Sequence, residues 1–161
     1  MNGIIFMKNK ILFLDFDGVL HPSMCDIKKY LSHAPLLAAL ITEYPCQIVI
    51  SSSWRFQYTL EEIKKMLPKA ISQQVIGITG EAYPGAYQRY NEIKFYLQVH
   101  GKSLADWKAL DDTQNEFPAH CKNLILCSHL TGLGQKQIQE LKNGYKNNYR
   151  LYIFNVFNDS F

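Results

Sequence analysis

A short apolar strand that runs directly into two acidic residues is the feature that most limits how this chain can fold. Residues 11–14 are Ile-Leu-Phe-Leu, and Asp15 and Asp17 follow on alternate positions. A continuous apolar run of this length is typical of a strand buried on both faces, as at the centre of a parallel sheet. Ligands of such sheets bind in the crevice outside the carboxyl ends of the strands, where both acids would stand. Two carboxylates this close together favour a bound cation or a shared proton, because charging both is costly.

Strand-like and helical patterns alternate along the chain, which predicts an α/β fold with a parallel sheet. The predicted strands cover residues 11–15, 47–50, 75–78, 107–110, 124–127 and 150–156. The predicted helices cover about 26–43, the segment that is capped by Thr59 and ends before Pro68, about 87–100, and 135–142. Thr59 and Glu62 have the spacing of a capping box, and Pro35 should kink or split the first helix.

Composition indicates a folded protein of one domain over residues 1–161. The chain is 47% hydrophobic and 19% charged, which excludes a disordered polypeptide. The net charge of +3 is mild and does not by itself indicate a nucleic acid partner. No stretch reaches the roughly 18 apolar residues of a membrane-spanning helix, and the segment before Lys8 is too short for a secretory signal. We therefore expect a soluble, cytoplasmic protein with no membrane partner.

Cysteine and histidine spacing argues against disulfides and zinc. No cysteine pair has C-x-x-C spacing, so we expect free thiols in a reducing compartment. The five histidines also lack ligand spacing, and we expect no zinc site. His21 is the histidine nearest in sequence to the first acidic pair. The cysteines are Cys25, Cys46, Cys121 and Cys127.

A second acidic pair ends a later strand. Asp111 and Asp112 follow one apolar run, and Ser51 follows another. The carboxyl ends of parallel strands meet at one edge of a sheet, so these side chains should gather beside the first acidic pair. One or two carboxylates, completed by water and substrate phosphate, are what Mg²⁺ needs in a protein. The two pairs together predict a Mg²⁺ site.

Each acidic motif also has an ordinary structural interpretation. Asp-x-Asp-Gly occurs in turns, where Asp bonds its own backbone, and Asp pairs are common at helix starts. A calcium loop does not fit, because Val19 and Leu20 stand at the positions that would need an oxygen ligand and a glycine. Two acidic pairs that each follow a strand favour the interpretation as a site.

Hydroxyl groups and a guanidinium follow the second strand. Ser51 and Ser52 lie close to Arg55, and such a combination suits phosphate oxygens. The competing interpretation is a polar strand end that caps the next element, with Trp54 in the core. Both interpretations stand at this point.

These motifs and their order resemble the haloacid dehalogenase (HAD) superfamily from about residue 11 to 130. The matching segments are Asp15-x-Asp17-Gly18-Val19, Ile48-Val49-Ile50-Ser51, a basic residue, and Leu110-Asp111-Asp112. Ser-Ser-Trp-Arg at 52–55, Arg-x-x-Glu-Ile at 89–93 and the Ala-Leu-Asp-Asp end resemble the phosphatase-like domains of RNA repair proteins. The resemblance implies a Rossmann-like three-layer sandwich with a mostly parallel central sheet.

The resemblance also implies roles for the acidic residues in Mg²⁺-dependent phosphoryl transfer. Asp15 would be the nucleophile, Asp17 the general acid and base, and Ser51 a hydrogen-bond donor to the phosphoryl group. Asp111 would complete the Mg²⁺ shell with Asp15 and the backbone carbonyl of Asp17, and Asp112 would support it.

The basic residue of the third motif has two candidates. The superfamily usually has Lys there, whereas Arg89 aligns best within the subgroup and Lys94 lies a turn later. Either side chain could hold a phosphate, although an exposed basic helix face is the ordinary interpretation. Ser52, Arg55 and Lys94 are the residues we expect to contact substrate.

The chain leaves no room for a large cap domain, because the segments after the first and second motifs are short or already used by predicted elements. An open site resembles those of members that act on large substrates, or that recruit a cap by oligomerising. We therefore expect a phosphomonoester phosphatase for a phosphorylated substrate, with a polynucleotide end as one form of that substrate.

Two rival functions stay open. They are a binding module with little turnover, and an enzyme for a non-phosphate substrate such as a haloacid, which would not need Asp111 and Asp112.

Overall fold

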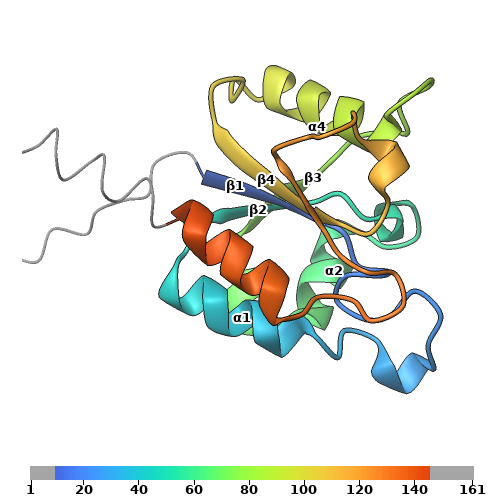
Figure 1. Cartoon of the computed structure of the whole chain (residues 1–161), viewed down its shortest axis with the longest axis vertical. Coiled ribbons are helices and arrows are strands. Elements are labelled where there is room, and N and C mark those ends of the chain that lie inside the picture. The colour runs from blue at the N-terminus through green and yellow to red at the C-terminus, as the bar shows by residue number, and fades with distance from the viewer. Residues whose placement is uncertain (1–9, 146–161) are drawn as a thin grey trace, which may run out of the picture.

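The computed structural model describes residues 10–145, which form a five-stranded, all-parallel sheet with helices on both faces (Figure 1). The strand order is β3-β2-β1-β4-β5. The strands are β1 (Lys10–Leu14), β2 (Gln47–Ile50), β3 (Val75–Ile78), β4 (Asp106–Asp111) and β5 (Leu124–Leu126). The predicted α/β sandwich is confirmed, and these strands lie within one residue of their predicted bounds. The strand predicted over 150–156 lies outside the described residues.

β1 is the central strand, and its position explains its unbroken apolar sequence. All five of its residues are buried, and it pairs with β2 on one side and β4 on the other. Leu14 is level with Ile50 of β2 and with Leu110 of β4. The residue that follows each of these three therefore reaches the carboxyl edge of the sheet at the same height.

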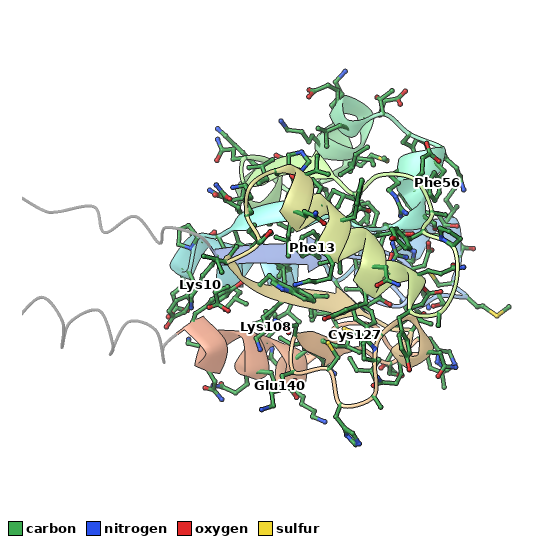
Figure 2. The ribbon with its side chains drawn as sticks, turned by 90° about the horizontal axis from the view of Figure 1, so that it is seen from above. Lys10, Phe13, Phe56, Lys108, Cys127 and Glu140 are labelled. Atoms are coloured by element: carbon green, nitrogen blue, oxygen red, sulfur yellow. The ribbon has the colours of Figure 1, made fainter. Side chains whose placement is uncertain are left out.

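Helices cover both faces of the sheet (Figure 1). α4 covers one face; α1, α2, α3 and the helix over 135–145 lie on the other. On the α4 side Phe13, labelled in Figure 2, packs edge-on against Tyr96 and Trp107, with ring centroids 5.8 Å apart in each pair. Leu12 and Leu14 enter the other core. The helix bounds are α1 (Ala34–Glu43), α2 (Leu60–Met66), α3 (Lys69–Ser72) and α4 (Gln88–Val99).

The single helix predicted over 26–43 is two elements. η1 is a 3-10 turn over Ile27–Lys29, and α1 begins only at Ala34. Leu31 between them has a φ of 57°, which helical backbone does not allow. Pro35 lies in the first turn of α1, where its missing N–H costs nothing. The predicted helix is therefore split, but the break lies before Pro35 and not at it, and α-helix over 26–33 was wrong. Ile27, predicted on the inner face, is 74% exposed.

The other helices agree with prediction except for short additions. Thr59 and Glu62 form the predicted capping box of α2, and α4 matches the helix predicted over 87–100. α3, which follows Pro68, was not predicted, and neither were the 3-10 turns η2 (Ser53–Phe56) and η3 (Gln114–Glu116). Residues 10–145 contain no large cap domain.

All four cysteines are unpaired, as predicted, and Cys46 and Cys127 are buried. Within residues 10–145, no helix combines the length and the apolar character needed to cross a bilayer.

Replacing Thr59 by Ala should lower the free energy of unfolding by about 1 kcal/mol, because the first turn of α2 loses its cap. Urea unfolding measures this change. Thr42→Ala is the matched control, since the Thr42 hydroxyl bonds only the Ala38 carbonyl within α1. That change should be neutral or slightly stabilising because Ala has the higher helix propensity. Equal losses in both variants would contradict the capping role.

Candidate functional site

Three strands deliver polar side chains to one point at the carboxyl edge of the sheet. Asp15 follows β1, Ser51 follows β2, and Asp111 is the last residue of β4. Backbone hydrogen bonds between the strands continue as far as these residues. The Asp15 N–H donates to the Leu110 carbonyl at 3.1 Å, and the Ser51 N–H donates to the Leu14 carbonyl at 3.0 Å. The gathering predicted from the parallel strands is therefore present.

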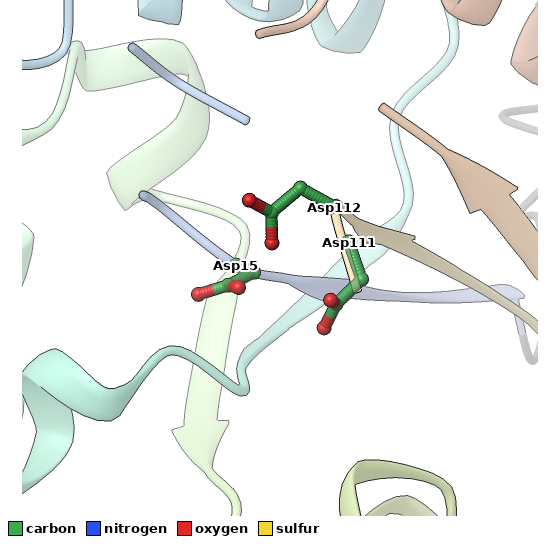
Figure 3. Close-up of side chains that lie close together, drawn as sticks. All are labelled: Asp15, Asp111 and Asp112. Atoms are coloured by element: carbon green, nitrogen blue, oxygen red, sulfur yellow. The ribbon is translucent and has the colours of Figure 1, made fainter. Parts of the chain in front are cut away.

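Three carboxylates form one cluster at this edge (Figure 3). Asp15, Asp111 and Asp112 each present an oxygen within 4.8 Å of the others. Asp15 and Asp111 are buried, and Asp112 is half-buried. The Asp17 side chain lies outside this cluster, so only its backbone carbonyl could take part in the predicted metal shell.

Gly18 makes the close approach of Asp112 feasible. Its φ of +70° suits glycine, and a Cβ at this position would overlap the Asp112 carboxylate. Hydroxyl donors hold that carboxylate, with Ser23 Oγ 2.9 Å from Oδ2 and Thr113 Oγ1 2.9 Å from Oδ1. The glycine of the first motif thus lets the loop after β1 pass directly beside the last acid.

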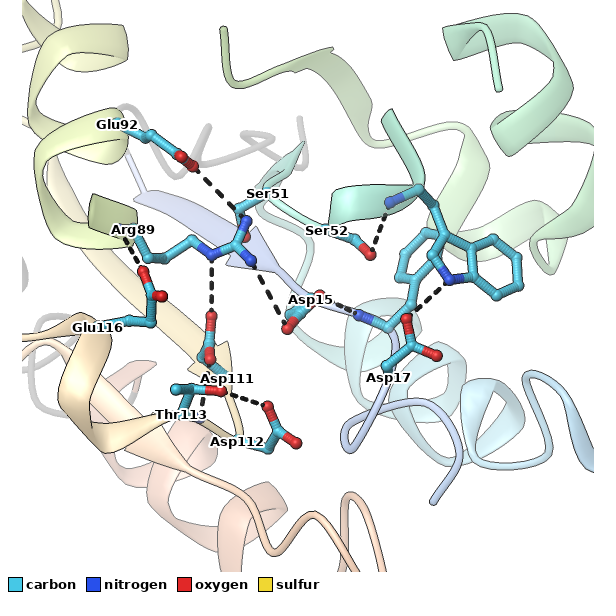
Figure 4. A network of polar contacts seen from close by, with 12 residues as sticks. Asp15, Asp17, Ser51, Ser52, Arg89, Glu92, Asp111, Asp112, Thr113 and Glu116 are labelled. Carbon is cyan, nitrogen blue, oxygen red and sulfur yellow. Dashed lines mark hydrogen bonds and ion pairs between the residues drawn. The ribbon is translucent and has the colours of Figure 1, made fainter. Parts of the chain in front are cut away.

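Arg89 is the cation of the cluster (Figure 4). Its Nε lies 3.2 Å from Asp111 Oδ2, and its Nη2 lies 4.0 Å from Asp15 Oδ2. The Glu116 carboxylate accepts the Arg89 backbone N–H at 2.9 Å and so caps α4, which has no cap of its own. Lys94 is exposed on α4 and makes no ion pair with any described residue. The structure brings Arg89 to the acids and leaves Lys94 away from them.

Arg55 has a structural position instead of the predicted phosphate-binding one. Its Nη1 donates to the carbonyls of Ser51 and Ser52 at 2.7 and 3.0 Å, and its Nε donates to the Gly80 carbonyl at 3.0 Å. Its Nη2 donates to Glu92 Oε2 at 2.8 Å. With its nitrogens used in this way and its side chain buried, Arg55 fixes the loop after β2.

Glu92 enters the sequence analysis only as part of the Arg-x-x-Glu-Ile motif, with no role given to it. It accepts from Arg55 and lies 3.6 Å from Arg89 Nη1, so it joins the loop after β2 to the first turns of α4. Its i,i+3 spacing from Arg89 places both side chains on one helix face, and this was the available signal.

The two serines after β2 differ in their bonding. The Ser51 hydroxyl is buried and has no hydrogen-bond partner among the described residues. The Ser52 hydroxyl accepts the Trp54 backbone N–H at 3.3 Å, and its position beside Asp15 works against the rise that burial causes in the pKa of that carboxyl. Since buried polar groups are nearly always paired, Ser51 is the one prepared to bind a ligand atom.

Asp17 is held by two ring N–H groups. Its Oδ1 lies 3.0 Å from His21 Nε2, and its Oδ2 accepts the Trp54 indole N–H at 2.8 Å. His21 Nδ1 accepts the Leu31 backbone N–H at 3.4 Å, so Nε2 carries the ring proton and donates to Asp17. The sequence indicates His21 only by its position and offers the core as one place for Trp54, which does pack there, so this clamp was not predicted.

The chain matches the family described as the HAD domain in Swiss Army Knife RNA repair proteins over residues 11–138. The chain belongs to this family. The match confirms the resemblance inferred from the motifs and includes all the residues of the site. No curated protein matches the sequence.

The electrostatics of this HAD domain suit a divalent cation. Burial raises the pKa of Asp111 to about 8, the charge of Asp15 adds to the rise, and Arg89 opposes it. Burial likewise raises the pKa of Asp15, again opposed by Arg89. Asp111 Oδ2 is buried and has no hydrogen bond, because its contact with Arg89 is an ion pair of poor alignment. An unbonded carboxylate oxygen in an acidic, oxygen-rich cluster fits Mg²⁺.

Gly18→Ala should displace Asp112 and remove the rise in Tm that we expect from added Mg²⁺ in the wild type, because the added methyl overlaps the carboxylate. Gly101→Ala is the matched control. Gly101 has a similar φ of +64° but no atom within 4 Å of the added Cβ. This control should lose stability, by about 1 kcal/mol, and keep the effect of Mg²⁺. Thermal unfolding with and without Mg²⁺ tests the pair, and a retained Mg²⁺ effect in Gly18→Ala would contradict the geometry.

The metal-free domain should lose stability as the pH rises. The pKa of Asp111 is 3.8 in its ordinary state and about 8 in the fold, so the native state keeps a proton that the unfolded chain releases. The contribution of this carboxyl is complete below about pH 4 and is lost as the pH rises toward about 8. Thermal unfolding in EDTA across that range measures the loss.

Asp111→Asn should flatten this pH dependence, since the amide does not titrate. Added Mg²⁺ should stabilise the wild-type domain more as the pH rises, because the proton and the cation compete for the same carboxylates. Equal slopes for the wild type and Asp111→Asn would contradict the assignment.

Proposed function

We propose that this HAD domain is a Mg²⁺-dependent phosphomonoester phosphatase that acts through an aspartyl-phosphate on Asp15. The observation that supports the proposal is the convergence, at one sheet edge, of the acidic cluster, the Arg89 guanidinium and the unpartnered Ser51 hydroxyl. The first group fits a metal, and the other two fit phosphate oxygens. Their position at the same edge of the sheet is what a phosphoryl-transfer site requires.

Asp15, Asp111 and Asp112, with the backbone carbonyl of Asp17, would hold the Mg²⁺. The bound ion supplies charge neutralisation between the attacking carboxylate and the phosphate. Arg89 places a second positive charge beside Asp15, and the Ser51 hydroxyl can donate to a phosphoryl oxygen. Catalysis then depends mainly on position and charge.

Asp15 attacks the phosphorus atom through a carboxylate oxygen, and the bond from phosphorus to the leaving alcohol oxygen breaks. Asp17 donates its proton to that oxygen. In the second step Asp17 takes a proton from water, and the water oxygen attacks phosphorus. The bond between phosphorus and Asp15 then breaks and phosphate is released. The Asp17 side chain is 42% exposed, so it can exchange protons while His21 and Trp54 hold it.

We propose a phosphorylated polynucleotide end as the substrate. The matched family is described from RNA repair proteins, and the absence of a large cap within residues 10–145 leaves the site open to a large molecule. A binding module with little turnover would show stabilisation by Mg²⁺ without phosphate release. Haloacid chemistry would not depend on Asp111 and Asp112.

Asp15→Asn should lower phosphate release from p-nitrophenyl phosphate by more than about a thousandfold, because the nucleophile is lost. Asp17→Asn should lower steady-state turnover by about a hundredfold or more and leave phosphoenzyme to accumulate, since no base remains to activate water. Phosphate release and acid-quench trapping of phosphoenzyme measure the two effects, each with Mg²⁺ and with EDTA.

Asp106→Asn is the matched control, because Asp106 lies at the opposite end of β4 from Asp111. Its turnover should equal that of the wild type. Unimpaired turnover in Asp17→Asn would contradict the acid–base assignment, and activity that persists in EDTA would contradict the Mg²⁺ dependence.

A further inference from the structure

An aromatic group lies beside Asp17, and we define it as Tyr30, Trp54 and Tyr58. Trp54, whose indole N–H bonds Asp17, lies 5.6 Å from the Tyr30 ring and 5.6 Å from the Tyr58 ring. Tyr30 also stacks on His21, at 4.7 Å between centroids. Of the two residues that clamp Asp17, Trp54 is therefore a member of this group and His21 is in ring contact with it.

The two tyrosines of the aromatic group are open to solvent. Tyr30 is 44% exposed and Tyr58 is 39% exposed, whereas Trp54 is only 8% exposed. Large aromatic side chains that gather on a surface beside a site mark a place where a ligand binds. Their faces suit a flat, apolar partner.

Positive charge accompanies the exposed rings. Lys28 and Lys29 form η1 with Ile27 and directly precede Tyr30. Both lysines are exposed, and neither makes an ion pair with a described residue. Aromatic faces interleaved with lysines are the pattern of proteins that bind single-stranded nucleic acid, where the rings stack on bases and the cations follow the phosphates.

The position of Asp17 shows which part of a substrate would reach these rings. In the view of Figure 4, Asp17 lies on the opposite side of Asp15 from Arg89 and Asp111. The leaving oxygen must lie next to Asp17 to receive its proton. The body of the leaving alcohol therefore extends toward the side chains that contact Asp17.

We infer that Tyr30 and Tyr58 are a base-stacking subsite for the leaving nucleoside and its neighbour in a single-stranded, phosphorylated RNA end. Lys28 and Lys29 attract the backbone phosphates of the same strand. This inference rests on the proposed phosphatase function and assigns its specificity to residues outside the reacting centre. A phosphotyrosine peptide would offer one ring and no run of backbone phosphates, so the lysines favour RNA.

Binding is tested in an Asp15→Asn background, which removes turnover, with a fluorescein-labelled single-stranded RNA that carries a 3′-phosphate. Tyr30→Ala and Tyr58→Ala should each weaken binding about tenfold by fluorescence anisotropy, as expected for the loss of one stacked base. Tyr58→Phe should bind like the parent, because stacking does not need the hydroxyl. Phe95→Ala is the matched control, since Phe95 is 53% exposed on α4, and its binding should not change.

Tyr58→Ala provides an independent test if Tyr30→Ala disturbs His21, because Tyr58 contacts Trp54 and not His21 among the ring pairs of the described residues. Equal binding by Tyr58→Ala and Phe95→Ala, or tighter binding of a phosphotyrosine peptide than of the RNA, would overturn the inference.

Phosphate release from p-nitrophenyl phosphate by the wild type is measured separately. Its absence would overturn the proposed function, whereas its presence together with unchanged RNA binding in Tyr58→Ala would overturn only the stacking subsite.

Discussion

The burial of Asp15 and Asp111 beside one available arginine among residues 10–145 is the constraint on which the rest of the site depends. Burial raises the pKa of both carboxyls, and Arg89 offsets only part of the cost. A second guanidinium is nearby, but Arg55 is bound to carbonyls and to Glu92. The excess of negative charge must therefore be met by protons or by a cation. An uncompensated buried charge would cost several kcal/mol, which is why this arrangement is more readily explained by ligand binding than by stability.

The sheet makes this unfavourable arrangement possible. β1 is buried along its whole length and hydrogen-bonded on both sides, so it holds Asp15 in place despite the repulsion from Asp111. The site also depends on a local exception, since Gly18 adopts a backbone conformation that other residues avoid and leaves the space that the Asp112 carboxylate occupies. Strong packing in the strands and a turn that requires glycine in the loop are thus two parts of the same structure. The first supplies rigidity, and the second supplies the close approach of the acids.

The sequence was sufficient for the parts of the site that follow from strand periodicity. Asp15, Ser51 and Asp111 each end an apolar run, and register alone brings them together. It was not sufficient where tertiary contacts decide. The sequence pattern predicts helix over 26–33, but the left-handed backbone conformation of Leu31 interrupts it. The sequence also suggests that Arg55 is free to bind phosphate, whereas its guanidinium donates to the carbonyls of Ser51 and Ser52. The clamp on Asp17 joins residues far apart in sequence, Trp54 and His21, and no local pattern indicates which ring will turn its N–H toward a carboxylate.

The two acids of the first motif occupy different environments, and this difference supports their different proposed roles. Asp15 is buried among charged groups, and its partners, Arg89 and the Phe16 backbone N–H, fix its direction. A nucleophilic carboxylate needs a fixed orientation toward the phosphorus atom more than it needs access to solvent. Asp17 is 42% exposed and receives its hydrogen bonds from His21 and from an indole N–H, which hold it without excluding water. An acid that must give and regain a proton in each cycle needs that access. One intervening residue, Phe16, separates the two environments, and its side chain is fully buried in the core.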